Sequence, residues 1–425
     1  MRLAPLFLLY VVVCAVAQPG GDPVRDEPAL LAAAERLVAH GQLAGTGTDP
    51  DQRAFLWHGP GLVVLLGPFV AFDVPLVAVR FLEPLLLGVA IALFHRLLRR
   101  RLDVRPALLW TYALGLYAPF FIVLGTIQKE PLSIVLVVAG MLALTYGLEC
   151  GRRSALAGAG LALGALAMVR LEYGWVALAL LVIAALWWAT HRQSATSRRL
   201  VAVAAVAVVA CVPWLAYTHA KTARAMYWSS SSGLSLFWMS PTLPGETGQW
   251  HSPVRVYRDP ALAPYRPLFR ALDEVHPLHS DLQLRRRAVA NVRADPMRYA
   301  RNVAANTSRL LFFAPVRSRH PPLGYAMYAL FNGLLLLAVI WAARMLWRRR
   351  RSLPPQTAPV ALFAALAVAV HLPVSASPRM LLPVVPALLW LVVVAFANGV
   401  APTTAGSAAQ AVDLKAPRRL DAAGR

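Results

Sequence analysis

The chain contains ten apolar runs, each close to the length that crosses the hydrocarbon core of a bilayer. Such runs constrain the fold strongly, because lipid offers no hydrogen bonds and a helix satisfies its own backbone groups. The sequence therefore predicts an all-α polytopic membrane protein with about ten transmembrane helices. The predicted crossings are Leu3–Ala17, Val74–Phe94, Pro106–Leu124, Pro131–Leu148, Ser154–Val169, Tyr173–Ala189, Leu200–Tyr217, Leu323–Trp347, Ala358–Pro373 and Met380–Ala397.

Composition agrees with this prediction. Of the 425 residues, 58% are hydrophobic, and the mean hydropathy of +0.55 is not that of a soluble domain. The formal charge is +22, from 42 Lys and Arg against 20 Asp and Glu. In a soluble protein this charge would suggest nucleic acid, but here the basic residues lie mostly in short loops between apolar runs. We therefore expect membrane lipids as partners and no nucleic acid.

The basic clusters predict the orientation of the chain. Arg96–Arg105, Arg152–Arg153, Arg192–Arg199 and Arg348–Arg351 all fall on one side of the membrane, together with the C-terminal tail, if the N-terminus is cytoplasmic. The sequence thus predicts a multi-pass protein of the cell (inner) membrane with both termini in the cytoplasm. An alternative for Leu3–Ala17 is a cleaved signal peptide ending in Ala15-Val16-Ala17, which would leave nine crossings.

The loops divide the chain into four predicted parts. Residues 1–219 form an N-terminal transmembrane core that includes a first outer loop, residues 18–73. Residues 220–322 form a long periplasmic or extracellular loop, residues 323–398 the C-terminal transmembrane helices, and residues 399–425 a disordered cytoplasmic tail. Two shorter segments have their own predictions: Leu62–Phe72, with Pro68 inside it, is interfacial or re-entrant, and Asp281–Phe313 has helical spacing.

With this orientation, most ionisable residues near the membrane fall on its outer side. Such residues are costly in lipid and are functional candidates by default. Their shared level predicts chemistry at the outer membrane boundary. The set comprises Asp26, Glu27, His58, Arg80, Glu83, Lys129, Glu130, Arg170, Glu172 and Arg379.

The types of charge also indicate a reaction. A carboxylate among several cations suits transfer from a phosphate-linked donor, in which a base deprotonates the acceptor hydroxyl and the cations hold the departing phosphate. A phosphate leaves as a stable anion, so no second carboxylic acid is needed to protonate it. Glycoside hydrolysis, by contrast, uses two carboxyl groups at a defined separation.

Structural roles are the alternatives for the same residues. Asp26 and Glu27 precede Pro28 and suit the first turn of a helix as simple N-terminal charges. Arg80 and Glu83 have i, i+3 spacing and suit mutual neutralisation. Snorkelling to lipid head groups is the corresponding role for Arg170 and Arg379.

Two further patterns favour structure over chemistry. Gly160-x-x-x-Gly164 is typical of close helix packing. DEVHPLHSD (residues 273–281) has a metal-like composition, but Pro277 breaks its helical register and no other ligand is anchored by a motif. We therefore expect neither a metal nor a cofactor.

Several segments carry a family resemblance. They are DEPALLAAAERLVAHG from Asp26 to Gly41, HGPGLVVLLGPFVAF from His58, QKEPLSIVL from Gln128, VRLEYG around Arg170 and SPRMLLPVVP around Arg379. In this order and spacing, over residues 1 to about 398, the chain resembles the GT-C superfamily of membrane glycosyltransferases that use polyprenyl-phosphate sugars. The likeness is to the bacterial branch with aminoarabinose transferases and protein mannosyltransferase-like enzymes.

The resemblance implies a GT-C-like fold and an inverting transfer of a sugar from a polyprenyl-phosphate carrier to an acceptor hydroxyl or amine. The donor would be a polyprenyl-phosphate-linked sugar, and the acceptor a lipid, a glycan or a protein. Asp26 would be the catalytic base and Glu27 its neighbour in the catalytic acidic pair. Glu130, Arg170 and Arg379 would contact the donor or its phosphate, and their outer position adds His58 and Lys129 to this set.

The chain also departs from the family pattern. Leu30 stands where an aromatic residue is usual, Gly59 replaces the first proline of a Pro-Pro element, and Met380 replaces a tyrosine. Two other functions stay open: a transporter or flippase for polyprenyl-linked sugars, and a non-catalytic binder of such carriers. Transporters have paired halves with interrupted helices at the midplane, whereas the charges here gather at one face.

Overall fold

The structure, a computed structural model, describes residues 2–24, 26–43, 55–192, 194–243, 245–315 and 322–400. Within these ranges the chain is helical and contains no β-strand. Six of the described helical segments are long and apolar enough to cross a membrane: Leu76–Leu98, Lys129–Cys150, Tyr173–Thr190, Ala195–Thr222, Ala326–Arg348 and Pro378–Ala397. The prediction of an all-α polytopic membrane protein is confirmed. Most of the tail predicted to be disordered, from residue 401 onward, lies outside the described residues.

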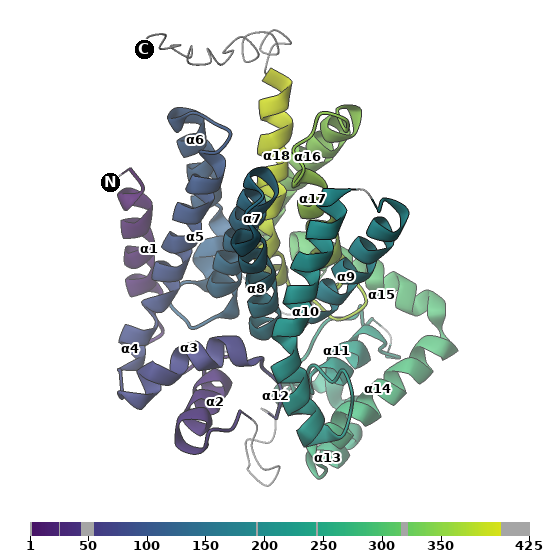
Figure 1. The fold of residues 1–425 in the computed structure, drawn as a ribbon. Helices are drawn as coiled ribbons and strands as arrows, with labels where there is room; N and C mark the ends of the chain where they lie inside the picture. Colours follow the sequence, from purple (N-terminus) through teal and green to yellow (C-terminus); the bar gives the residue numbers. More distant parts are fainter. Residues whose placement is uncertain are drawn as a thin grey trace, which may run out of the picture.

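A bundle of roughly upright helices makes up the larger part of the molecule (Figure 1). Five of them match their predicted crossings within two residues at each end: α1 (Ala4–Ala17), α7 (Lys129–Cys150), α8 (Arg153–Val169), α9 (Tyr173–Thr190) and α16 (Pro322–Arg348). The other bundle helices are α4 (Leu76–Val79), α5 (Leu82–Leu98), α6 (Val104–Gly115), α10 (Ala195–Thr222), α17 (Thr357–Ala369) and α18 (Val385–Val400).

Prolines account for the places where predicted helices are interrupted. The crossing predicted for Pro106–Leu124 is wrong as a continuous helix, because α6 ends at Gly115 and a 3₁₀ helix, η2 (Ala118–Val123), follows. Pro119 has no backbone N–H and disfavours the α conformation at the residue before it. Another 3₁₀ helix, η4 (Pro378–Val384), precedes α18 and contains Pro383.

Prolines also lie where two other predicted helices end or divide. The helix predicted for Asp281–Phe313 is two helices, α14 (Pro277–Ala294) and α15 (Pro296–Phe312), because Pro296 starts a new helix. The crossing predicted to reach Pro373 ends at Ala369, and the chain then runs to η4 without a regular helix.

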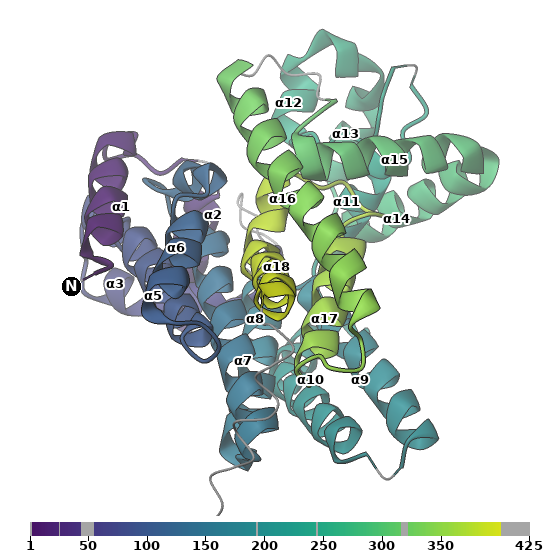
Figure 2. The same cartoon turned by 90° about the horizontal axis from the view of Figure 1, so that it is seen from above.

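A second group of helices lies toward the lower end of the bundle in Figure 1. α2 (Glu27–His40) and α3 (Pro60–Ala71) pack on each other there, and α3 runs across the bundle axis, as an interfacial segment would. The remaining helices are α11 (Ser232–Met239), α12 (Pro253–Arg258), η3 (Pro260–Tyr265) and α13 (Arg266–Asp273), together with α14 and α15. Figure 2 shows α12 to α15 gathered on one side of the bundle.

Two packing features hold these groups in place. α11 to α14 share an aromatic core in which the rings of Trp238 and Phe269 stack with centroids 5.7 Å apart. In the bundle, α8 and α10 approach closely at Gly160 and Gly164. A Cβ at Gly160 would lie 2.6 Å from the carbonyl oxygen of Val203, so the packing interpretation of this motif is confirmed.

The start of α2 is fixed by a buried ion pair. Both Glu27 and Arg80 have fully buried side chains, and Arg80 donates through Nε to Oε1 at 2.9 Å and through Nη2 to Oε2 at 2.7 Å. The backbone N–H groups of Val24 and Ile127 also donate to this carboxylate, at 2.8 and 2.7 Å. Arg80 also donates to the carbonyl oxygen of Asp22. One carboxylate therefore joins α2, the α4–α5 junction and the segment that leads into α7.

Removing Arg80 should destabilise the protein strongly. Arg80→Met leaves the Glu27 carboxylate buried without its counter-charge, a change that costs about 3–5 kcal/mol in comparable buried pairs. Thermal unfolding in one detergent, followed by tryptophan fluorescence, should show a clear drop in the midpoint. Arg96→Met, which removes an exposed arginine of α5, is the matched control. Equal midpoints for the two variants would contradict the role assigned to the pair.

Candidate active site

A cavity of about 1100 Å³ opens where the bundle meets α11 and α14. Its lining includes six of the seven residues predicted from the sequence: Asp26, His58, Lys129, Glu130, Arg170 and Arg379. The seventh, Glu27, is fully buried next to the cavity and points into the ion pair with Arg80. The structure therefore brings together residues that are up to 353 positions apart, from Asp26 to Arg379.

Helix ends place these side chains. Asp26 is the N-cap residue of α2, Lys129 and Glu130 open α7, Arg170 is the C-cap of α8, and Glu172 is the N-cap of α9. The N-termini of three helices therefore meet at the cavity, and the first backbone N–H groups of a helix have no partner within it. Their partial positive charges favour an anion in this region.

Asp26 forms an ion pair with Arg379 in the lining of the cavity. Nη2 of Arg379 lies 2.9 Å from Oδ2 of Asp26, and Nη1 donates to Oε1 of Gln128 at 2.7 Å. The Asp26 side chain keeps 36% of its surface exposed and makes no helix-capping hydrogen bond. Burial alone would raise the pKa of Asp26, but the charges of Arg379 and Lys129 outweigh it and hold the pKa below its usual value. The carboxylate is thus ionised at neutral pH and open to the cavity.

A second ion-pair cluster lies beside the first. Arg170 donates through Nη1 to Glu130 at 3.1 Å and through Nε to Glu172 at 2.9 Å. Its side chain is only 5% exposed, so it does not snorkel to lipid head groups. Burial opposes the charge of Glu172, yet the Arg170 guanidinium lowers the pKa of this carboxyl to about 2. Arg170 is held by protein carboxylates, whereas the side-chain ammonium group of Lys129 has no hydrogen bond or ion pair among the residues that the structure describes.

His58 is placed by an unusually close contact between α3 and α8. A Cβ at Gly59 would lie 2.1 Å from the carbonyl oxygen of Met168, so no larger residue fits there. Burial and the nearby charge of Lys129 hold the pKa of His58 well below its usual value, and its buried Nδ1 has no partner among the described residues. His58 is therefore a neutral imidazole at the cavity wall.

Comparisons with known proteins show a structural likeness but no match in sequence. No family model and no curated protein matches the chain. Among solved structures, the chain is similar to the crystal structure of ArnT from Cupriavidus metallidurans bound to undecaprenyl phosphate. The two share 16% sequence identity, the match covers 93% of this chain and 78% of that chain, and the TM-score is 0.40.

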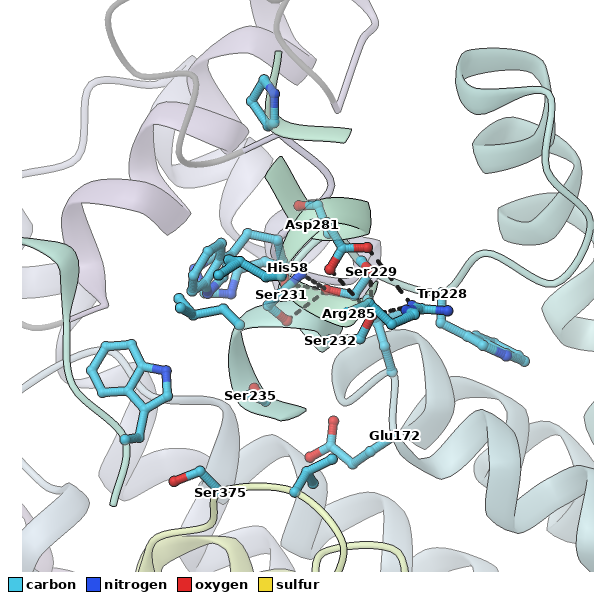
Figure 3. A pocket seen from close by; sticks show the side chains of 18 of the residues that line it. His58, Glu172, Trp228, Ser229, Ser231, Ser232, Ser235, Asp281, Arg285 and Ser375 are labelled. Carbon is cyan, nitrogen blue, oxygen red and sulfur yellow. Dashed lines mark hydrogen bonds and ion pairs between the residues drawn. The ribbon is translucent and has the colours of Figure 1, made fainter. Parts of the chain in front are cut away.

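A further part of the cavity wall was not predicted from the sequence. It consists of a run of serines with Trp228, Asp281 and Arg285 around it, as Figure 3 shows. Arg285 donates to Ser232 at 2.5 Å, and the backbone N–H of Gly233 donates to Asp281 at 2.5 Å, which fixes α11 on α14. The sequence signal was the stretch WSSSSG, residues 228–233, but serine runs are also typical of loops.

One buried asparagine shapes a third part of the wall. Nδ2 of Asn306, in α15, donates to the carbonyl oxygens of His371 and Val374, and its Oδ1 accepts from the N–H of Ala376. These bonds fix the irregular segment between α17 and η4, which leads to Arg379. His371, Ser375 and Ser377 line the cavity from this segment. Nothing in the sequence links Asn306 to these residues, because the contact spans 65 or more positions.

Some alternative roles can now be decided. The suggestion that Arg80 and Glu83 neutralise each other is wrong, because Arg80 pairs with Glu27 while Glu83 accepts from the backbone N–H of Gln128 at 3.1 Å. In the metal-like segment, His276 caps α14 by accepting from the N–H of Leu278. The described residues hold no group of three or more His, Cys, Asp or Glu side chains that could bind a metal ion.

Glu172 should make stability depend on acid pH. A carboxyl whose pKa is lower in the folded chain contributes stability that is complete above its ordinary value of 4.5 and is lost as the pH falls toward about 2. We expect wild type to unfold at a higher temperature than Glu172→Gln at pH 6, and this gap to shrink by pH 3. Thermal unfolding at several pH values measures it. A gap that does not change with pH would contradict the assignment.

Proposed function

We propose that the chain is an inverting glycosyltransferase that moves a sugar from a polyprenyl-phosphate carrier to an acceptor hydroxyl or amine. The proposed location is the outer face of the cytoplasmic membrane, with both termini in the cytoplasm. The observation that carries the proposal is the half-exposed carboxylate of Asp26, set beside Lys129 and Arg379 in a cavity at the end of an apolar bundle. The order of the sequence motifs supports the same family of reactions.

Asp26 would act as the general base. In the transfer step, the acceptor oxygen forms a bond to the anomeric carbon of the sugar while its proton passes to Asp26. The bond between the anomeric carbon and the phosphate oxygen breaks at the same time, and the phosphate leaves with the electron pair. Attack from the face opposite the phosphate inverts the anomeric centre. The leaving phosphate needs cations rather than an acid, and Lys129 and Arg379 provide them.

The pair between Arg379 and Asp26 couples donor binding to base strength. Arg379 is 37% exposed, so a donor phosphate can compete with Asp26 for its guanidinium. A phosphate that binds Arg379 would draw the guanidinium away from Asp26 and bring negative charge beside it, and both effects raise the pKa of Asp26. The base would therefore become stronger once the donor is bound. Arg170 would contribute less to phosphate binding, because Glu130 and Glu172 already hold its guanidinium.

Glu27 would support catalysis by position. Its carboxylate accepts hydrogen bonds from Arg80 and from the backbone of Val24 and Ile127, so it does not face the cavity. It would keep the N-terminus of α2 and the segment before Lys129 in register. The acceptor would enter past the serine wall, which belongs to the predicted long outer loop.

Asp26→Asn should abolish transfer and preserve donor binding. Asparagine has nearly the same shape but accepts no proton, and loss of a general base lowers rates about 10²–10⁴-fold. The protein should be purified in native lipid, and the bound lipid identified by mass spectrometry. We expect intact polyprenyl-phosphate sugar on Asp26→Asn and the spent phosphate carrier on wild type. The same lipid in the same state on both would contradict a base role and favour a transporter or a binding protein.

Lys129 should contribute to phosphate affinity. Lys129→Met retains the length of the side chain but removes the cation, and we expect binding of polyprenyl phosphate to weaken about tenfold or more. A titration in detergent, followed by tryptophan fluorescence, measures the change. Lys221→Met is the matched control, because Lys221 is exposed at the end of α10 and does not line the cavity. Equal losses in both variants would indicate a general charge effect.

A further inference from the structure

One corner of the cavity has polar groups that the transfer step does not use. Glu172, His371 and Ser377 all line the cavity, and Figure 3 shows Glu172 and Ser375 at the end opposite Ser229, Ser231 and Arg285. His371 is only 2% exposed, yet its Nε2 has no hydrogen-bond partner among the described residues. The buried Oγ of Ser377 has none either.

Without a ligand, these two unpaired atoms lower the stability of the folded protein. A buried polar atom without a partner loses its hydrogen bonds to water and gains nothing in return, so such atoms are few in native proteins. Ser377 is also the N-cap residue of η4, where a serine hydroxyl normally accepts from the helix backbone, but it makes no such bond. A ligand in the cavity would supply the missing partners.

The chemistry of the corner identifies the kind of ligand group. The Glu172 carboxylate only accepts hydrogen bonds, and 30% of its side chain is exposed. Arg170 shares one positive charge between Glu130 and Glu172, so these three side chains together keep a net negative charge. A phosphate is therefore repelled there and attracted by Lys129 and Arg379. A hydroxyl group both donates and accepts, so it matches a carboxylate, an imidazole nitrogen and a serine hydroxyl together.

We propose that Glu172, His371 and Ser377 form a subsite that binds the hydroxyl groups of the donor's sugar ring. The inference rests on the proposed function, since it assumes a phosphate-linked sugar in this cavity. The donor then lies with its phosphate toward Lys129 and Arg379 and its sugar toward the corner. Asp26 and the serine wall stay accessible to the acceptor. The subsite selects sugars with free hydroxyls and disfavours a sugar acid, whose carboxylate would face Glu172.

Ser377→Ala is the sharpest test, because it removes a hydroxyl that has no partner among the described residues. We expect the midpoint of thermal unfolding in detergent to stay the same as in wild type or to move to a higher temperature. Affinity for a polyprenyl-phosphate sugar should weaken roughly 3–10-fold, whereas affinity for bare polyprenyl phosphate should stay the same. The probes are polyprenyl phosphate of one chain length, alone and linked to arabinose, mannose, glucose or glucuronic acid.

Thr357→Val is the matched control. Thr357 is 2% exposed and its hydroxyl also lacks a partner among the described residues, but it lies at the start of α17 and does not line the cavity. It should leave affinity for every probe unchanged. Glu172→Gln retains an acceptor for Arg170 and should reduce affinity for the neutral sugar carriers about tenfold, while weakening the discrimination against glucuronic acid.

The outcomes separate this inference from the proposed function. If Ser377→Ala and Glu172→Gln change the affinities for bare and sugar-linked carriers equally, the sugar subsite is wrong while carrier binding stands. The subsite is equally wrong if sugar-linked carriers bind both variants as tightly as they bind wild type. If wild type binds none of the probes, the proposed function itself fails.

Discussion

The candidate site depends on the buried ion pair between Glu27 and Arg80. The Glu27 carboxylate accepts two hydrogen bonds from Arg80 and one each from the backbone of Val24 and Ile127. Removing two charges from water is expensive, so such a pair persists only when all of its hydrogen bonds are satisfied. Once satisfied, it fixes the residues next to it in sequence. Asp26 precedes Glu27, and Lys129 follows Ile127 by two positions, so one buried pair sets the positions of both.

The lining of the cavity offers a ligand two kinds of polar group. Lys129 and Arg379 gather near Asp26, where the N-termini of α2 and α7 add partial positive charge. Glu172, with its pKa near 2, and the unpaired imidazole of His371 lie toward another corner. A ligand with an anionic end and a hydroxyl-rich end fits this division in one direction. Under the proposed function, this arrangement would set the orientation of the bound donor as well as its affinity.

Much of the candidate site was predictable from local sequence patterns. The apolar runs and basic loops placed the ionisable residues on one side, and helix-start signals such as Asp-Glu-Pro placed Asp26 at the first turn of a helix. Lys129 and Glu130 were singled out because they lie in the short turn between two predicted crossings. Proline positions were the main source of error, because hydropathy measures burial in lipid and does not register a missing backbone N–H. Pro119, Pro296 and Pro383 therefore interrupted helices that the apolar pattern had joined.

By itself, the sequence determined that the chain is helical and polytopic, and which ionisable residues lie near the ends of its apolar runs, because hydrophobicity and charge act through local patterns. Only the tertiary structure decided how those residues are divided. It turned Glu27 inward to Arg80 and left Asp26 in the cavity, although the two are adjacent carboxylates. It also joined Asn306 to the segment that leads to Ser377 and Arg379. These pairings depend on contacts between distant helices, and no local pattern specifies which partner a buried charge will meet.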